Sequence, residues 1–150
     1  MSKQLFVEDL PVGRVLKSEG TVEVTAAEIV EFARRYDPQP AHLSDAGAAG
    51  TLFGTLAASG WHTAAMTMSL FVGLGLTGTI GSGIDLTWVT PTRPGDRLGL
   101  ELRVVAVRPS RHRPSYGVVE LEYDTVNQAG EVRQRTHAVI LVPYRVVPPD

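Results

Sequence analysis

Cysteine is missing from the 150-residue chain. The protein therefore has no disulfide, no thiolate nucleophile and no cysteine-based metal site. The chain also lacks a strong excess of charge, because its net charge is −2 and its basic residues form no long run. Nucleic-acid binders usually carry a basic patch, so we do not expect DNA or RNA as a partner.

The N-terminal region lacks the features of a secretory signal. Residues 1–10 contain Glu8 and Asp9 and have neither a basic start nor a long apolar stretch. We therefore expect a cytoplasmic protein.

No repeat, low-complexity tract or flexible linker divides the chain, and 43% hydrophobic and 20% charged residues are ordinary for a globular protein. A single domain spanning residues 1–150 is expected.

Charged residues are absent from Ala46 to Ile84, and residues 61–74 are apolar on nearly every face. A membrane-spanning helix needs about 20 predominantly apolar residues. Polar residues and glycines interrupt this stretch: Ser59, His62, Thr63, Thr67, Ser69, Gly73 and Gly75. We therefore predict no membrane span. The stretch instead predicts a helix from the N-cap Ser59 to about Leu74, buried on all sides and wrapped by a sheet.

An earlier helix is predicted after Thr25, because Thr25-Ala26-Ala27-Glu28 has the form of a capping box. Apolar residues then recur on one helical face: Ile29, Phe32, Ala33 and Tyr36. Asp37 and Gln39 each precede a proline, which disfavours helical geometry. We therefore predict a stiff, non-helical loop from Asp37 to His42.

The second half of the chain has the alternating pattern of strands. Apolar and polar residues alternate over 84–88 and 98–104, with a turn at 91–96 between them. Further strands are predicted at 116–126 and 133–144. One or two early helices followed by a meander of long antiparallel strands indicate an α+β fold.

The proline-stiffened loop holds the best candidates for acid–base chemistry. A carboxylate and an imidazole can share the proton transfers needed to hydrate an enoyl thioester, and Asp37 and His42 lie at opposite ends of this loop. The enolate oxygen would need N–H donors, which the first turn of the predicted central helix supplies. Ser59 and Gly60 begin that helix, and a glycine allows a carbonyl to approach the backbone closely.

The segment Asp37-Pro38-Gln39-Pro40-Ala41-His42-Leu43-Ser44-Asp45 resembles the Asp-x-Asn-Pro-x-His-x-Asp signature of MaoC-like acyl dehydratases and (R)-specific enoyl-CoA hydratases. Further features of that family follow in the same order: Ala46 to Ala49, Phe53-Gly54, Ser59-Gly60, Pro91 and Gly95-Asp96. The resemblance extends from about Thr25 to Leu98. It implies a hot-dog fold, in which an antiparallel sheet wraps around a central buried helix, assembled as a homodimer or larger homo-oligomer.

The resemblance also implies roles for individual residues. It places the catalytic pair at Asp37 and His42 and the oxyanion-hole glycine at Gly60, with Ser59 beside it in the substrate-binding set. Ser59 stands where the family often has histidine, a departure that bears on substrate choice.

Two departures fall inside the signature itself. Gln39 replaces the usual asparagine. Ser44 stands where the final aspartate is expected, with Asp45 one place late. We expect both changes to have mild effects.

These assignments predict a hydratase or dehydratase that adds water reversibly to a trans-2-enoyl thioester. The carrier would be coenzyme A or acyl carrier protein, as part of the substrate, with no separate cofactor. A thioesterase is an alternative that the same fold often supports, but it would need a carboxylate on the central helix, and residues 59–74 contain none. A catalytically silent acyl-thioester binding or regulatory protein is the third reading, and the presence of both Asp37 and His42 argues against it.

Other polar candidates are weaker. The histidines at 42, 62, 112 and 137 have no metal-ligand spacing, so no metal is expected. His62 is expected to be a packed histidine in the first turn of the central helix. Arginines 108, 111 and 113 could meet coenzyme A phosphates, but a solvated loop is the preferred interpretation.

Overall fold

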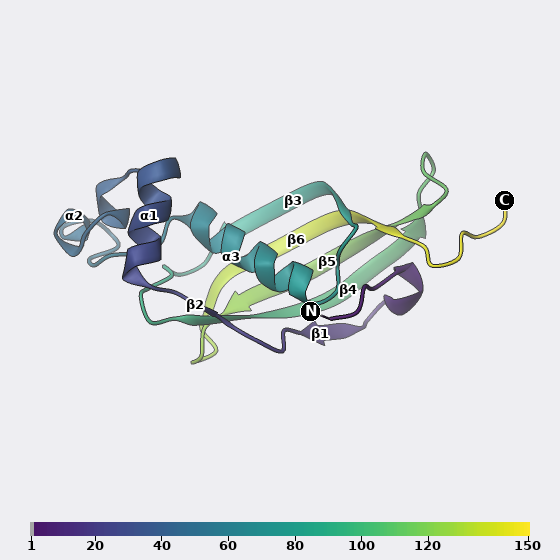
Figure 1. Ribbon diagram of the computed structural model, residues 1–150, viewed down its shortest axis with the longest axis horizontal. Helices are drawn as coiled ribbons and strands as arrows, with labels where there is room; N and C mark the ends of the chain where they lie inside the picture. The colour runs from purple at the N-terminus through teal and green to yellow at the C-terminus, as the bar shows by residue number, and fades with distance from the viewer. Residues whose placement is uncertain (1) are drawn as a thin grey trace.

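The computed structural model describes residues 2–150, in which one antiparallel sheet curls around one long helix (Figure 1). The elements in chain order are η1 (Val7–Asp9), β1 (Val15–Lys17), β2 (Val22–Glu23), α1 (Ala26–Tyr36), η2 (Pro40–His42), α2 (Asp45–Ala48), α3 (Gly60–Gly73), β3 (Ile80–Trp88), β4 (Arg97–Pro109), β5 (Tyr116–Val126) and β6 (Val132–Pro143). The strand order is β1-β4-β5-β6-β3, and β2 also pairs with β4. The α+β class and the hot-dog arrangement expected from the sequence are confirmed.

The sheet has one apolar face because its strands follow the predicted alternation. The inward residues of β4 are each at most 1% exposed: Leu98, Leu100, Leu102 and Val104. On β5, Val119, Leu121 and Tyr123 continue this face towards α3. Burial of each such side chain stabilises the fold by roughly 1.5–3 kcal/mol, so this face of the sheet forms the core.

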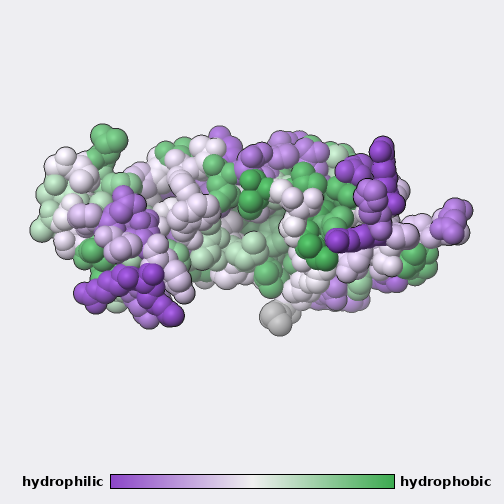
Figure 2. All heavy atoms as spheres, turned by 90° about the horizontal axis from the view of Figure 1, so that it is seen from above, coloured by the Kyte–Doolittle hydropathy of each residue, from purple (hydrophilic) through white to green (hydrophobic). Residues whose placement is uncertain are grey.

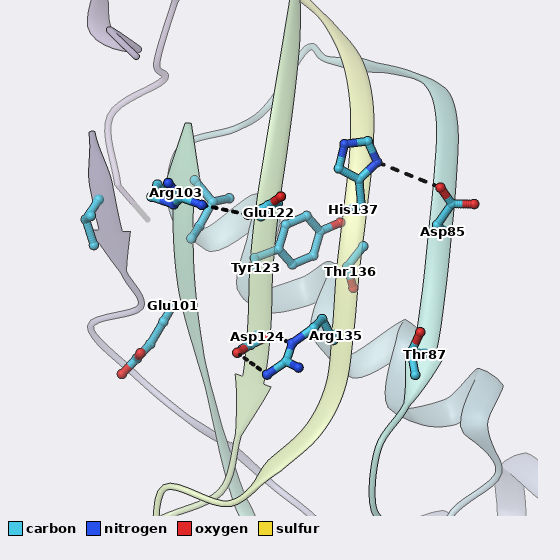
Figure 3. Close-up of a pocket in the computed structure, with 12 residues that line it drawn as sticks. Asp85, Thr87, Glu101, Arg103, Glu122, Tyr123, Asp124, Arg135, Thr136 and His137 are labelled. Carbon is cyan, nitrogen blue, oxygen red and sulfur yellow. Dashed lines mark hydrogen bonds and ion pairs between the residues drawn. The ribbon is translucent and has the colours of Figure 1, made fainter. Parts of the chain in front are cut away.

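The outer face of the sheet carries ion pairs between neighbouring strands (Figure 3). The arginine pairs are Arg103 with Glu122 at 2.7 Å and Arg135 with Asp124 at 2.9 Å. His137 lies 2.5 Å from Glu120 and 3.8 Å from Asp85, and the hydrogen bond to Glu120 raises the pKa of its imidazole. All of these residues except Glu120 line a hollow of about 410 Å³. Each of these charges already has an opposite partner, so the hollow is a solvated structural face.

The central helix α3 begins where the sequence predicts, but the expectation that it is buried on all sides is wrong. The hydroxyl of Ser59 accepts a hydrogen bond from the Trp61 N–H at 3.3 Å and so caps the helix. Met66, Leu70 and Phe71 face the sheet, whereas Trp61, Met68 and Val72 are 60%, 49% and 37% exposed. A single sheet covers only one side of a helix. Within residues 2–150, no helix is long and apolar enough to cross a membrane.

Helix α1 also begins as predicted, since the Thr25 hydroxyl accepts a hydrogen bond from the Glu28 N–H at 3.2 Å. Ile29 and Ala33 are buried, but the predicted apolar face fails at Tyr36, which is 65% exposed. The loop that follows is not wholly non-helical, because Pro40–His42 forms a 3-10 turn. Proline fits the first position of a helical turn, where its missing N–H has no partner to lose.

A buried ion pair joins the turn between β3 and β4 to strand β6. Arg133 binds Asp96 through two hydrogen bonds, at 2.9 and 3.1 Å, and the side chains are only 9% and 6% exposed. Asp96 also accepts hydrogen bonds from the Arg93 N–H and the Asn127 amide. Burial raises the pKa of Asp96, but these hydrogen bonds and the charge of Arg133 outweigh burial and lower it.

We predict that Asp96→Ala lowers the free energy of unfolding by about 3–5 kcal/mol, because Arg133 is left as a buried charge without its partner. The matched control is Glu122→Ala, which breaks an exposed pair and should cost less than about 1 kcal/mol. Urea unfolding at neutral pH measures both. Equal losses in the two variants would contradict the role given to the buried pair.

The pH dependence gives a second check of this pair. The folded-state pKa of Asp96 is depressed, so its stabilisation is present above the pKa of an unfolded aspartate and is lost as the pH falls through the folded value. The difference in stability between wild type and Asp96→Ala should therefore shrink in acid.

Candidate active site

A short loop brings Asp37 and His42 together at the end of α1. Asp37 is the C-cap of α1, and its N–H still bonds to the Ala33 carbonyl at 2.9 Å. The turn Pro40–His42 then directs the imidazole back, so that Asp37 Oδ2 lies 3.4 Å from His42 Nε2. This separation is longer than a normal hydrogen bond. Both groups therefore remain able to bind the same third group, such as a water.

The backbone fixes the proton position of His42. The residue is 4% exposed, and its Nδ1 lies 2.7 Å from the Ala57 carbonyl oxygen. A carbonyl only accepts hydrogen bonds, so Nδ1 must carry the proton of the neutral ring. Nε2 then presents its lone pair beside Asp37. The ring of Phe53 packs edge-on at 5.4 Å and helps to hold this orientation.

Asp37 is held as a carboxylate. Its side chain is 18% exposed, and its Oδ1 accepts a 2.6 Å hydrogen bond from the amide of Gln39. Burial raises the pKa of Asp37, but Gln39, the Ser59 hydroxyl and the electrostatic influence of the neighbouring His42 together lower it. The glutamine that replaces the expected asparagine therefore binds the proposed catalytic carboxylate directly.

The start of α3 supplies a donor to the same place. Gly60 is its first residue, and first-turn N–H groups have no partner within the helix and lie at the positive end of its dipole. Gly60 lines a cavity of about 370 Å³ together with Asp37 and His42. Ser59 is fully buried and does not line the cavity. Its roles are to cap α3 and to lower the pKa of Asp37.

A tryptophan explains why position 60 has no side chain. A Cβ at Gly60 would lie 2.5–2.8 Å from atoms of the Trp88 indole. The missing side chain therefore makes room for a ring from β3, and the prediction that the Gly60 N–H meets a substrate carbonyl stays a prediction. The remaining cavity walls are mixed in character: Gln39, Phe53, Ala58, Trp61, Thr63, Trp88, Val89, Thr90, Pro91, Thr92 and Arg133.

The segment between His42 and α3 explains the second departure in the signature. Ser44 caps α2 by accepting the Gly47 N–H at 2.9 Å, and Asp45 Oδ1 accepts the Leu56 N–H at 2.8 Å. A Cβ at Gly47 would lie 2.3 Å from the Pro40 carbonyl oxygen, so α2 packs against the η2 turn only with glycine there. The shifted serine and aspartate therefore both stabilise the loop.

Long-range contacts also support the site, and sequence reasoning missed most of them. The guanidinium of Arg93 donates to the carbonyls of Phe53 and Thr55, at 2.6 and 2.7 Å. Thr92 accepts the Ala58 N–H at 2.9 Å and bonds to Thr63 at the same distance. The only local signal was the Pro…Gly-Asp turn at 91–96, and its partners lie far away in the sequence.

The other polar candidates lie outside this cavity. His62 is buried and stacks on Phe32 at 4.7 Å, and burial lowers the pKa of its imidazole. The arginines of the β4–β5 hairpin lie with His112 around a separate open hollow. Among the described residues, no three histidine, aspartate or glutamate side chains converge as metal ligands would.

Comparison with known proteins gives one consistent family. The family model of the MaoC like domain matches residues 8–127. A 3-hydroxybutyryl-CoA dehydratase of Methylorubrum extorquens is 36% identical over 73% of this chain and 69% of its own length. The crystal structure of a MaoC-like dehydratase from Rhodospirillum rubrum is 50% identical, covers 95% of this chain and 99% of its own, and has a TM-score of 0.89. An unliganded (R)-hydratase from Pseudomonas aeruginosa is 26% identical over 98% and 96% of the chains, with a TM-score of 0.76.

We predict that Gly60→Ala displaces the Trp88 ring and lowers the free energy of unfolding by about 1–3 kcal/mol, as overpacking does. Thermal or urea unfolding measures the loss, and the tryptophan fluorescence should shift. The double variant Gly60→Ala/Trp88→Val should recover part of the loss, because the clashing ring is gone. Additive losses in the double variant would show that the two positions do not conflict.

Proposed function

Because the chain belongs to the MaoC-like dehydratase family, we propose that it catalyses the reversible addition of water to the double bond of a trans-2-enoyl thioester. One observation carries this proposal: the carboxylate of Asp37, the unprotonated nitrogen of His42 and the first residue of α3, Gly60, line one cavity. The relative named as a 3-hydroxybutyryl-CoA dehydratase supports coenzyme A as the carrier.

In the proposed reaction, a water binds between Asp37 Oδ2 and His42 Nε2. Nε2 takes one proton from the water as its oxygen bonds to C3 of the substrate. The electrons of the double bond move to the thioester oxygen, where the Gly60 N–H stabilises the enolate. The enolate then re-forms the carbonyl as C2 takes the proton back from Nε2.

Asp37 has an electrostatic role in this scheme. Its pKa is low, so it stays ionised at neutral pH and stabilises the imidazolium that forms at His42. The buried Ala57 carbonyl keeps the other ring nitrogen protonated throughout. The same nitrogen removes and returns the proton, so water adds to one face of the substrate.

We predict that Asp37→Asn and His42→Ala each lower turnover of crotonyl-CoA by about a hundredfold or more, the range for loss of an acid–base group. Loss of the conjugated thioester absorbance measures the rate. The double variant should be little slower than the slower single variant, because both residues act on one water. Asp124→Asn, on the outer face of the sheet, is the control and should keep its rate.

A parallel measurement of free thiol separates the alternatives, because both hydration and thioester cleavage remove the conjugated absorbance. A thioesterase would release free thiol from crotonyl-CoA, and a binding protein would leave the thioester unchanged. Near-normal hydration by the double variant would exclude the proposed roles of Asp37 and His42.

We further propose that the active unit is a homodimer joined along β3. This strand is at the edge of the sheet and leaves backbone groups unpaired, which is a common site of association. Apolar side chains are exposed on it and on the neighbouring side of α3: Ile80, Ile84, Trp88, Trp61, Met68 and Val72. Figure 2, viewed from above Figure 1, shows hydrophobic residues gathered along the middle of the molecule. Trp61 and Trp88 also line the catalytic cavity, so a second copy would cover its rim.

We predict that the wild type sediments as a dimer or larger species and that Ile84→Lys shifts it towards a less active monomer. Ile84 is 55% exposed on β3. The matched control is Val15→Lys, since Val15 is 57% exposed on β1 at the opposite edge of the sheet. A stable, fully active wild-type monomer would contradict the proposed dimer.

A further inference from the structure

Two separate cavities are each lined by residues of α3 and β3. The catalytic cavity, about 370 Å³, is next to the first turn of α3 and the end of β3. A second cavity of about 630 Å³ lies farther along, between the last turns of α3 and the start of β3. Its walls are largely apolar, with Phe71, Ile84, Tyr123 and Ile140 among them. An alkyl group would be favoured there if it could reach this space from the catalytic cavity.

A polar bridge joins β3, β6 and α3 at positions between the residues that line the two cavities. The Trp88 Nε1–H donates to Gln134 Oε1 at 3.0 Å, and these residues are directly paired on β3 and β6. The Gln134 amide donates to Thr67 of α3 at 3.5 Å and to Thr136 at 3.2 Å. Thr67 is also 2.7 Å from the Thr125 hydroxyl. Gln134 and both of its threonine partners are buried.

The Trp88 ring is held on several sides. Its indole lies against Gly60 at the start of α3, so tightly that no Cβ would fit between them. The Trp61 ring packs edge-on against it at 5.3 Å. With its nitrogen bonded to Gln134, the ring cannot rotate away without breaking a partly buried hydrogen bond. It is therefore a fixed wall of the catalytic cavity.

We propose that Trp88, held by Gln134, is the residue that restricts the substrate to short acyl chains. This inference rests on the proposed hydration of enoyl thioesters. A longer alkyl chain would have to pass the indole and the buried polar groups of Gln134 and Thr67 to reach the apolar cavity. Passing them would leave those groups without partners, which is costly. A chain as short as crotonyl ends before the wall.

The test compares kcat/KM for crotonyl-CoA and trans-2-octenoyl-CoA in wild type, Trp88→Ala and Trp88→Val. The wild type should prefer crotonyl-CoA by about tenfold or more, and both variants should reduce this preference by about tenfold or more, the scale of discrimination by pocket shape. Two substitutions of different size keep the test valid if one of them fails to fold. Val89→Ala is the matched control, because Val89 lines the same cavity but has no bond to Gln134, and its chain-length ratio should stay unchanged whatever its rate.

Calorimetric binding of butyryl-CoA and octanoyl-CoA provides a readout that does not need turnover. Suppose that no enoyl-CoA is hydrated, but that butyryl-CoA binds more tightly than octanoyl-CoA and the Trp88 variants lose this preference. The proposed function is then wrong, whereas the role of Trp88 in limiting chain length is supported. Equal use of both chain lengths by the wild type, or an unchanged ratio in the folded Trp88 variants, would overturn the role of Trp88.

Discussion

The buried ion pair between Asp96 and Arg133 is the constraint on which the site depends. It fixes the turn before β4, and that turn binds the segment leading into α3 through the Thr92 carbonyl and the Arg93 guanidinium. The same segment carries the Ala57 carbonyl, which determines which nitrogen of His42 is protonated. A charge pair outside the Asp37 to His42 loop therefore supports the carbonyl that orients His42. Because the pair is desolvated, its geometry is maintained by several hydrogen bonds that would all have to break together.

Polar groups within the core also divide the molecule into regions. Hydrogen bonds of Thr67 with Thr125 and with Gln134 connect α3 to β5 and β6. The cavity that Asp37 and His42 line lies towards the first turn of α3, and the apolar cavity lies towards its last turns. The network therefore explains both the order of the core and the proposed limit on the substrate.

Local patterns in the sequence predicted the elements well, but they could not predict what covers them. Alternation identified the strands and capping residues identified both main helices, since these signals depend on neighbours in the chain. The exposed side of α3 was missed because apolar composition does not distinguish a core from an interface. Asp37, His42 and Gly60 were found through one loop and one helix start, and the structure places them on one cavity. Trp88, Gln134 and Arg133 were missed, because they join the site only when β3 and β6 pair.

The proposed proton-transfer groups and the proposed wall of the cavity come from different parts of the chain. Asp37 and His42 belong to the helical segment at one end of the molecule, whereas Trp88 and Gln134 belong to the sheet (Figure 1). Substitutions on β3 and β6 can therefore reshape the cavity while the loop that carries the acid–base pair stays the same. If these roles hold as proposed, the preferred acyl group and the chemistry are separable traits for evolution or laboratory selection, and new substrate ranges are accessible without rebuilding the acid–base pair.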